Sequence, residues 1–206
     1  MHLEVLNDSG KKILPLLHRC GNFYLAGGTA LALQIGHRIS ADFDLFAEKE
    51  ISKTHLSSVK KVFRDSTITV SVNNSEELTL FINDVKVTFL TYPFPVVLDF
   101  VVLEKMPMLG VKELAATKAY TIGRRGSYKD YVDLYFVLSE KMILLEEILD
   151  LAKKKYAHEF NGRLFLEQLA YLDDIGDTEI VPLRGAPLDK TILEHFFSEE
   201  IRKVTL

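Results

Sequence analysis

Hydrophobic and polar positions follow different patterns in the two parts of the chain. Up to about residue 105, short apolar runs alternate with turns rich in glycine, asparagine and proline, which is typical of mixed strands and helices. From about Gly110 onward, apolar residues recur at the spacing of amphipathic helices. The sequence therefore predicts an α+β protein with two lobes, 1–105 and 106–206, of which the second is helical.

The predicted strands are short and are bounded by turn-forming residues. They cover residues 22–26, 43–47, 67–72, 78–82 and 85–91. The last three are expected to form an antiparallel meander, because asparagine-rich turns separate them. The predicted helices cover residues 11–20, 29–35, 52–63, 111–124, 129–140, 143–156, 164–172 and 191–203. Ser9 is the expected cap of the first helix, Gly36 is the expected end of the second, and 173–187 is an expected loop.

Composition and charge narrow the class of protein. Of 206 residues, 48% are hydrophobic and 26% charged, as in ordinary soluble globular proteins. A net charge of −4 gives no overall basic field, so any contact with nucleic acid would need a local patch. Cys20 is the single cysteine, which excludes an internal disulfide and suits a reducing cytosol. Without a leader or an apolar run of the roughly 18–20 residues that span a bilayer, we expect a cytoplasmic protein with no membrane partner.

Gly27 and Gly28 lie between an apolar strand and a helix rich in alanine and leucine. Glycine permits backbone conformations that other residues avoid, and it leaves the first helical turn open to close approach. Free N–H groups and the positive end of the helix dipole favour a phosphate there, and Thr29 could cap the helix or donate to that phosphate. A tight strand–helix turn with no ligand is the alternative interpretation.

Asp42 and Asp44 are two residues apart at the predicted strand 43–47, so their side chains project from the same face. Apolar neighbours indicate a buried strand, where two like charges need a cation or a donor between them. Carboxylate oxygens favour Mg²⁺ or Mn²⁺ that bridges to phosphate oxygens. The alternative is that one aspartate caps a turn while the other pairs with Arg38.

Lys118 lies on the apolar stripe of the predicted helix 111–124, seven residues after Val111. A lysine on a buried face needs an anionic partner or a path for its stem to reach water. A nucleoside triphosphate would be such a partner, and a lysine that reaches water at the edge of the lobe is the alternative.

Two acids stand at the start of an apolar helix. Asp130 and Asp133 are one turn apart and share a face, although both could simply complement the helix dipole. Arg124, Arg125 and Lys129 lie close by in sequence and form the densest basic cluster. This cluster suits a nucleic-acid backbone or an ordinary solvated loop.

Taken together, these motifs resemble the AbiEii/AbiGii toxin family of nucleotidyltransferases, within the DNA polymerase β-like superfamily. The resemblance covers about residues 20–140 and rests on segments 25–33, 36–46 and 129–134 and on the helix with Lys118. It implies a small mixed sheet flanked by helices, followed by a helical lobe that completes the active-site cleft. The implied nucleotide-binding residues are Gly27, Gly28, Thr29, Arg38 and Lys118. The implied catalytic residues are Asp42, Asp44, Lys118 and Asp130, of which Asp42 and Asp44 bind the metal.

The resemblance also implies a reaction. A hydroxyl would attack the α-phosphorus of an NTP in the presence of Mg²⁺ and release pyrophosphate. The macromolecular acceptor would be the 3′ end of tRNA, and the protein would be the toxin of a toxin–antitoxin or phage-defence system, with a cognate antitoxin as partner.

One departure from the polymerase β-like pattern leaves alternatives open. Many such enzymes carry a third carboxylate on a later strand, whereas strand 85–91 presents Lys86, Thr88 and Leu90 on the corresponding face. Asp130 or Asp133 could compensate, and Asp84 is a poorer candidate. The alternatives are a catalytically degenerate nucleotide-binding module that acts through a partner, or an enzyme that nucleotidylates a protein side chain.

Overall fold

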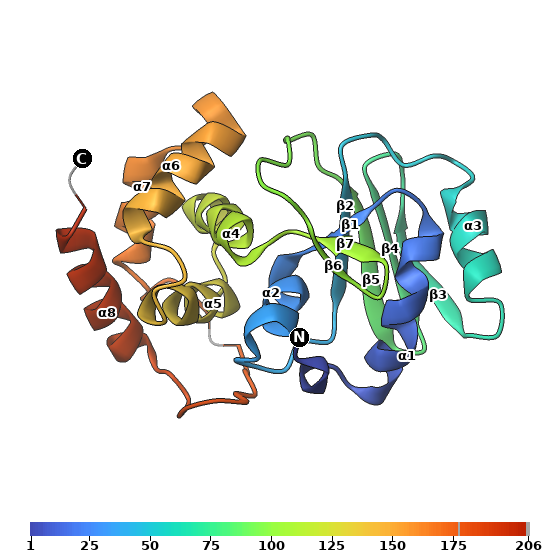
Figure 1. Cartoon of the computed structure of the whole chain (residues 1–206), viewed down its shortest axis with the longest axis horizontal. Helices are drawn as coiled ribbons and strands as arrows, with labels where there is room; N and C mark the ends of the chain where they lie inside the picture. Colours follow the sequence, from blue (N-terminus) through green and yellow to red (C-terminus); the bar gives the residue numbers. More distant parts are fainter. Residues whose placement is uncertain (177, 205–206) are drawn as a thin grey trace. The chain divides into compact units, whose positions relative to one another are not determined.

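The computed structural model describes residues 1–176 and 178–204, which form two compact units. The first unit comprises Met1–Pro95 and Asp99–Gly110, and the second comprises Val96–Leu98 and Val111–Leu206. Figure 1 shows the strands in the first unit and a set of helices in the second. The predicted α+β class is confirmed.

The first unit is built around one mixed sheet. Its seven strands are β1 (Tyr24–Ala26), β2 (Phe43–Ala47), β3 (Ile68–Asn73), β4 (Glu77–Ile82), β5 (Val85–Thr91), β6 (Val101–Leu103) and β7 (Met106–Met108). They are ordered β3-β4-β5-β2-β1-β7-β6. The β2–β5 and β1–β7 pairs are parallel and the other neighbours are antiparallel, so the predicted meander β3-β4-β5 is confirmed.

The short hairpin β6–β7 was not expected from the sequence. Each strand has three residues, which is too short for a clear alternation of apolar and polar positions. Its turn residues Glu104 and Lys105 have positive φ angles of 50° and 66°, although turns of this kind usually carry asparagine or glycine. The sequence therefore lacks the ordinary signal for this hairpin.

The helices of the first unit are α1 (Asp8–Leu17), α2 (Gly27–Ile35) and α3 (His55–Val62), with short 3₁₀ turns at Leu3–Val5 and His18–Cys20. The expected cap at Ser9 is wrong: the Asn7 side chain caps α1 by accepting from the Gly10 N–H at 2.7 Å. The helix therefore starts three residues before the predicted position. Gly36 ends α2 in the left-handed conformation, with φ of 65°, as predicted.

The two faces of the central strands have different surroundings. Phe43, Leu45, Val87 and Phe89 are fully buried on one face, where they contribute to the hydrophobic core. Asp44 and Thr88 lie on the opposite face, because successive strand residues point to opposite sides. This alternation excludes the carboxylate of Asp44 from the core of the unit.

The second unit consists mainly of helices. They are α4 (Val111–Arg125), α5 (Tyr128–Ser139), α6 (Leu145–Tyr156), α7 (Gly162–Leu169) and α8 (Lys190–Arg202), with a 3₁₀ turn at Ala157–Glu159. Each was predicted, with ends displaced by no more than three residues. Of the predicted loop 173–187, residue 177 lies outside the described residues, and the rest contains neither a helix nor a strand.

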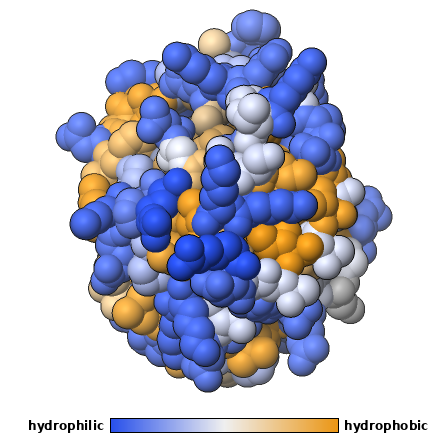
Figure 2. Space-filling view, turned by 90° about the vertical axis from the view of Figure 1, so that its right-hand side faces the viewer, coloured by the Kyte–Doolittle hydropathy of each residue, from blue (hydrophilic) through white to orange (hydrophobic). Residues whose placement is uncertain are grey.

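Hydrophilic side chains cover most of the surface in Figure 2, with smaller hydrophobic areas between them. Within residues 1–176 and 178–204, no helix has both the length and the apolar character needed to cross a bilayer.

A buried ion pair ties a short connecting segment to two helices of the second unit. Lys155 on α6 lies 2.6 Å from Oε1 of Glu113 on α4, and both side chains are 0% exposed. The carboxylate of Glu113 also accepts from the backbone N–H groups of Val97 and Leu98, at 3.0 and 2.9 Å. Segment Val96–Leu98 therefore belongs to the second unit because its backbone donors satisfy a buried carboxylate there.

Replacing Lys155 by methionine should lower the free energy of unfolding by about 3–5 kcal/mol, because Glu113 would remain buried without its cation. The matched control is Lys112→Met, since Lys112 pairs with Glu147 at 3.5 Å where both side chains are about half exposed. That change should cost less than about 1 kcal/mol. Urea unfolding followed by circular dichroism measures both, and equal losses would contradict the buried-pair interpretation.

Candidate functional site

The first turn of α2 lies against the carboxylate of Asp44. β1 pairs with β2 so that Ala26 is opposite Asp44, which brings the residue after Ala26 next to that side chain. A Cβ atom on Gly27 would lie only 2.2 Å from Asp44 Oδ2, and Gly27 has a φ angle of +68°. Both the space and the backbone conformation therefore require glycine at position 27.

The N-cap residue of α2 supplies no side-chain cap. Ala26 occupies the N-cap position and cannot accept from the helix, so the first N–H groups of α2 have no side-chain acceptor at that position. Gly27 and Gly28 are both half-buried and carry no side chain to cover the first turn. This end of the helix favours an anion, through its N–H groups and through the positive end of its dipole.

Thr29 connects this helix to the segment that carries Asp42. Its side chain is buried, and its hydroxyl donates to the backbone carbonyl of Asp42. Ser40 Oγ lies 2.8 Å from the same hydroxyl and can donate to it, since Thr29 has only one proton. In this structure Thr29 therefore positions the backbone of Asp42.

The two predicted metal-binding aspartates have different surroundings. Asp44 is half-buried in β2, whereas Asp42 is exposed immediately before that strand. Arg38 is buried, and its Nη1 donates to the carbonyl of Ile39 at 3.1 Å. Arg38 thus supports the segment between α2 and β2.

The residues around Asp44 suit a divalent cation shared with a phosphate. Within the described part of the chain, no three His, Cys, Asp or Glu side chains form a group that could hold a metal ion by themselves. Asp42 and Asp44 supply two hard oxygen donors, and the missing Cβ of Gly27 lets the Asp44 carboxylate lie against the first turn of α2. A cation such as Mg²⁺, which commonly takes one or two carboxylates together with substrate phosphates and water, fits these donors.

The strand next to β2 carries hydroxyl groups on the face that also carries Asp44. Thr88 is the β5 partner of Asp44, and Thr79 on β4 is the partner of Thr88. The Thr79 and Thr88 hydroxyls lie 3.2 Å apart, and Thr79 lies 2.6 Å from Oε1 of Glu77. The predicted strand 78–82 begins one residue after Glu77, so this contact was not expected from the sequence.

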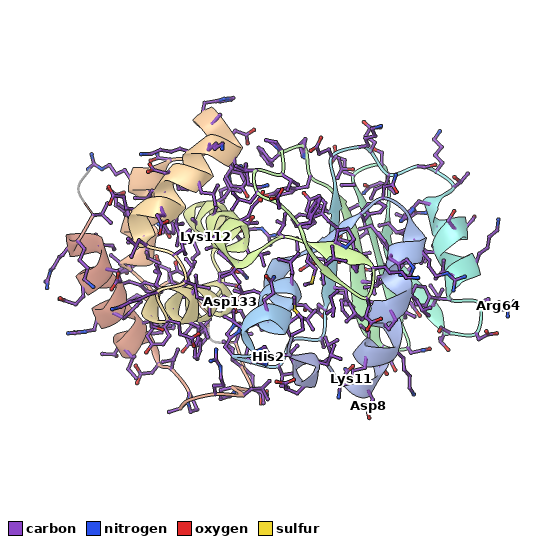
Figure 3. The ribbon with its side chains drawn as sticks, in the orientation of Figure 1. His2, Asp8, Lys11, Arg64, Lys112 and Asp133 are labelled. Atoms are coloured by element: carbon purple, nitrogen blue, oxygen red, sulfur yellow. The ribbon has the colours of Figure 1, made fainter. Side chains whose placement is uncertain are left out.

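Lys118 lies in a cluster of opposite charges within the second unit. It is buried on α4, and its Nζ lies 2.6 Å from Asp130 Oδ1 and 2.7 Å from Asp133 Oδ2, both on α5. Figure 3 labels Asp133 on that helix. Lys118 was expected on a buried stripe with an anionic partner, and the structure provides that partner from the chain itself.

The charge state of Lys118 follows from this cluster. Burial by itself would lower its pKa, but the carboxylates of Asp133 and Asp130 outweigh burial and raise the pKa above the ordinary value of 10.5. Lys118 is therefore a fixed cation at neutral pH.

Asp130 has a second role as the N3 residue of the capping box at the start of α5, where Ser127 is the N-cap. Its Oδ2 accepts from the backbone N–H of Ser127 at 3.0 Å and from the Ser127 hydroxyl at 2.8 Å. The dipole-complementing role considered from the sequence therefore coexists with the bond to Lys118. In the nearby basic cluster, Arg124 lies 4.4 Å from the ring centre of Tyr120 and pairs with Glu159 at 3.2 Å.

The predicted site residues thus form one group in each unit. Gly27, Gly28, Thr29, Asp42 and Asp44 gather around the start of α2 in the first unit. Lys118 and Asp130 lie together in the second unit, and Asp133 completes their cluster.

Comparison with known proteins identifies the family. The model of the family described as "Nucleotidyl transferase AbiEii toxin, Type IV TA system" matches residues 14–202. An uncharacterized protein of Aquifex aeolicus, aq_aa25, is 33% identical over 160 residues, which is 75% of this chain and 76% of that protein.

Two solved structures share the fold. MenT4, a nucleotidyltransferase toxin of Mycobacterium tuberculosis, is similar with a TM-score of 0.63 and 17% identity over 95% of this chain and 83% of its own. JHP933 of Helicobacter pylori is similar with a TM-score of 0.52 and 15% identity over 96% of this chain and 95% of its own. The match of the family model over most of the chain decides the assignment: this protein is a nucleotidyltransferase of the AbiEii toxin family, which belongs to type IV toxin–antitoxin systems.

Proposed function

We propose that this nucleotidyltransferase moves an NMP from an NTP onto a hydroxyl of a macromolecule, with the 3′ end of tRNA as acceptor. The observation that carries the proposal is the carboxylate of Asp44 beside the first turn of α2, where Gly27 and Gly28 carry no side chains. The N-terminus of the helix stabilises a phosphate, and the carboxylate stabilises a divalent cation. A nucleotide with its bound metal ion supplies both groups together.

In this proposal the backbone N–H groups of Gly27 and Gly28 bind phosphate oxygens of the NTP. Asp42 and Asp44 would hold Mg²⁺ or Mn²⁺, which supplies charge neutralisation at the phosphates. Thr29 keeps Asp42 in place through its backbone, and Arg38 supports the intervening segment. The acceptor hydroxyl attacks the α-phosphorus in line, the bond to the β-phosphate breaks, and pyrophosphate leaves.

In this proposal Lys118 is a fixed cation that stabilises negative charge on the phosphates of the NTP. Asp130 and Asp133 restrict its ammonium group to one position, which reduces the reorganisation needed when negative charge develops. Asp130 acts in this proposal through Lys118, because Lys118 and Ser127 already bind both of its oxygens.

The proposed biological role follows from the family. The protein would act as the toxin in the cytoplasm, where NTPs are available, and a cognate antitoxin would restrain it. Detection of an antitoxin that binds this chain and suppresses transfer would support that role.

The replacement Asp44→Asn should reduce label transfer from NTP to tRNA on the order of 100-fold or more, because it removes a charged ligand of the cation. The assay incubates total tRNA with each labelled NTP and Mg²⁺. Asp8→Asn is the matched control, since Asp8 is highly exposed on α1 and is labelled in Figure 3 away from the sheet.

Three outcomes would change the proposal. Undiminished transfer by Asp44→Asn would remove Asp44 from the reaction. Label that appears on protein would identify a protein-nucleotidylating enzyme instead. NTP binding without transfer to RNA or protein would indicate a degenerate binding module.

Gly27→Ala should abolish transfer while the protein stays folded, because the new methyl group would displace the Asp44 carboxylate. Gly185→Ala is the control for backbone strain alone, since Gly185 has a φ angle of +72° and no atom within 4 Å of the added Cβ position. Gly185→Ala should lose on the order of 1 kcal/mol in thermal unfolding, and Gly27→Ala should lose more, because it adds the contact with Asp44 to a similar backbone strain. Retention of full activity by Gly27→Ala would contradict the importance of this close approach.

Lys118→Met should destabilise the protein by about 3–5 kcal/mol, because two buried aspartates would lose their shared cation. Adding Asp130→Asn and Asp133→Asn should restore much of the stability without restoring transfer. The stabilisation by Lys118 is fully present below pH 10.5 and is lost only as the pH rises through its higher folded-state pKa. Chemical unfolding and transfer assays on the single and triple variants separate the two roles, and an active triple variant would exclude Lys118 from the reaction.

A further inference from the structure

Five aromatic side chains of the first unit form a continuous row, which we call the aromatic row. In order, they are Phe100, Tyr24, Phe46, Tyr92 and Phe94. The successive ring centres are 5.2, 6.2, 4.5 and 5.1 Å apart. Each ring contacts the next, and Phe46 and Tyr92 are stacked with an angle of 26° between their planes.

The aromatic row lies on the same face of the sheet as Asp44. Phe46 follows Asp44 by two residues in β2, and Tyr24 on β1 is the partner of Phe46. Two residues of a strand correspond to roughly 7 Å, so the row passes about that distance from the backbone of Asp44. The row therefore continues the surface on which the proposed reaction takes place.

One end of the row is held by a rigid segment. Tyr92 and Phe94 alternate with Pro93 and Pro95, whose rings fix the backbone φ angles. The Tyr92 N–H donates to the carbonyl of Ala47 at 2.7 Å, which anchors this segment to the end of β2. Tyr24 and Phe46 in the middle of the row are buried, at 6% and 9% exposed. Tyr92 and Phe94 are half-buried and Phe100 at the other end is 41% exposed, so the two ends of the row present preorganised ring surface to a ligand.

We propose that the aromatic row binds unpaired bases at the 3′ end of the acceptor RNA by stacking. Aromatic side chains bind single strands in this way because every base has a π-face. One nucleobase would cover one or two rings, so accessible rings at both ends of the row (Tyr92, Phe94 and Phe100) suit several consecutive nucleotides of a strand better than the base of the NTP. The inference rests on the proposed function, because it is the acceptor strand whose end must reach Asp44.

The test is the affinity for a fluorescently labelled, unstructured oligoribonucleotide, measured by anisotropy without NTP or Mg²⁺. Tyr92→Ala and Phe100→Ala should each weaken binding about 5- to 150-fold. The matched control is Phe81→Ala, because Phe81 on β4 is 37% exposed and lies outside the row. Its affinity should equal that of the unchanged protein.

A second variant tests the stacking itself. The chain contains no tryptophan, so Tyr92→Trp introduces a single reporter that can still stack. Its fluorescence should be quenched by the oligoribonucleotide, whereas an oligomer with the same phosphates but abasic 3′ positions should quench it much less. Equal quenching by the abasic oligomer would overturn the proposal.

Other results also decide between explanations. Equal losses for Phe81→Ala and the row variants would overturn the proposal, as would a loss of NTP affinity with RNA affinity unchanged. So would a loss of antitoxin affinity alone, which would assign the row to a protein partner.

Transfer activity of the unchanged protein is a separate readout. If transfer persists while the row variants bind RNA normally, the proposal for the aromatic row fails and the proposed function stands. If transfer is absent while RNA binding depends on the aromatic row, the proposed function fails and the proposal for the row stands.

Discussion

The close approach between Asp44 and the backbone of Gly27 is the constraint on which the first unit depends. Pairing of β1 with β2 sets Ala26 opposite Asp44, and α2 begins at the next residue. No room remains for a side chain at position 27, so the carboxylate and the open end of the helix share one small space. The strand register brings Asp44 to this position. The positive φ angle of Gly27 and the start of α2 at that residue make the contact possible.

Local sequence patterns predicted most of the fold. Strands β2 and β5 and the five long helices of the second unit have strong periodicity, and their predicted bounds are close to those observed. Gly36 ended α2 as expected, because only a residue tolerant of the left-handed conformation suits that position. The order of strand, glycine turn and helix around Gly27 was also predicted, whereas a phosphate and a metal at Gly27 and Asp44 stay predictions.

Interactions between distant residues could not be predicted in the same way. The stripe of α4 indicated that Lys118 is buried, but its ion pairs with Asp130 and Asp133 depend on how α4 packs against α5. Glu113 and Lys155 are 42 residues apart, and nothing in the local pattern of either helix indicates their pairing. The aromatic row likewise joins β1, β2 and two later segments through tertiary contacts alone.

The path of the chain at segment Val96–Leu98 limits how this protein can be divided. The chain enters the second unit for three residues, returns to build β6 and β7, and then leaves for α4. A fragment that began at α4 would therefore lack the two backbone donors that satisfy Glu113. A cut between Leu98 and Glu113 separates this carboxylate from its donors, and a cut before Val96 removes β6 and β7 from the sheet of the first unit, so the helical part is not an exchangeable module. Natural recombination between relatives would have to preserve the whole stretch from β5 to α4 as one inherited block.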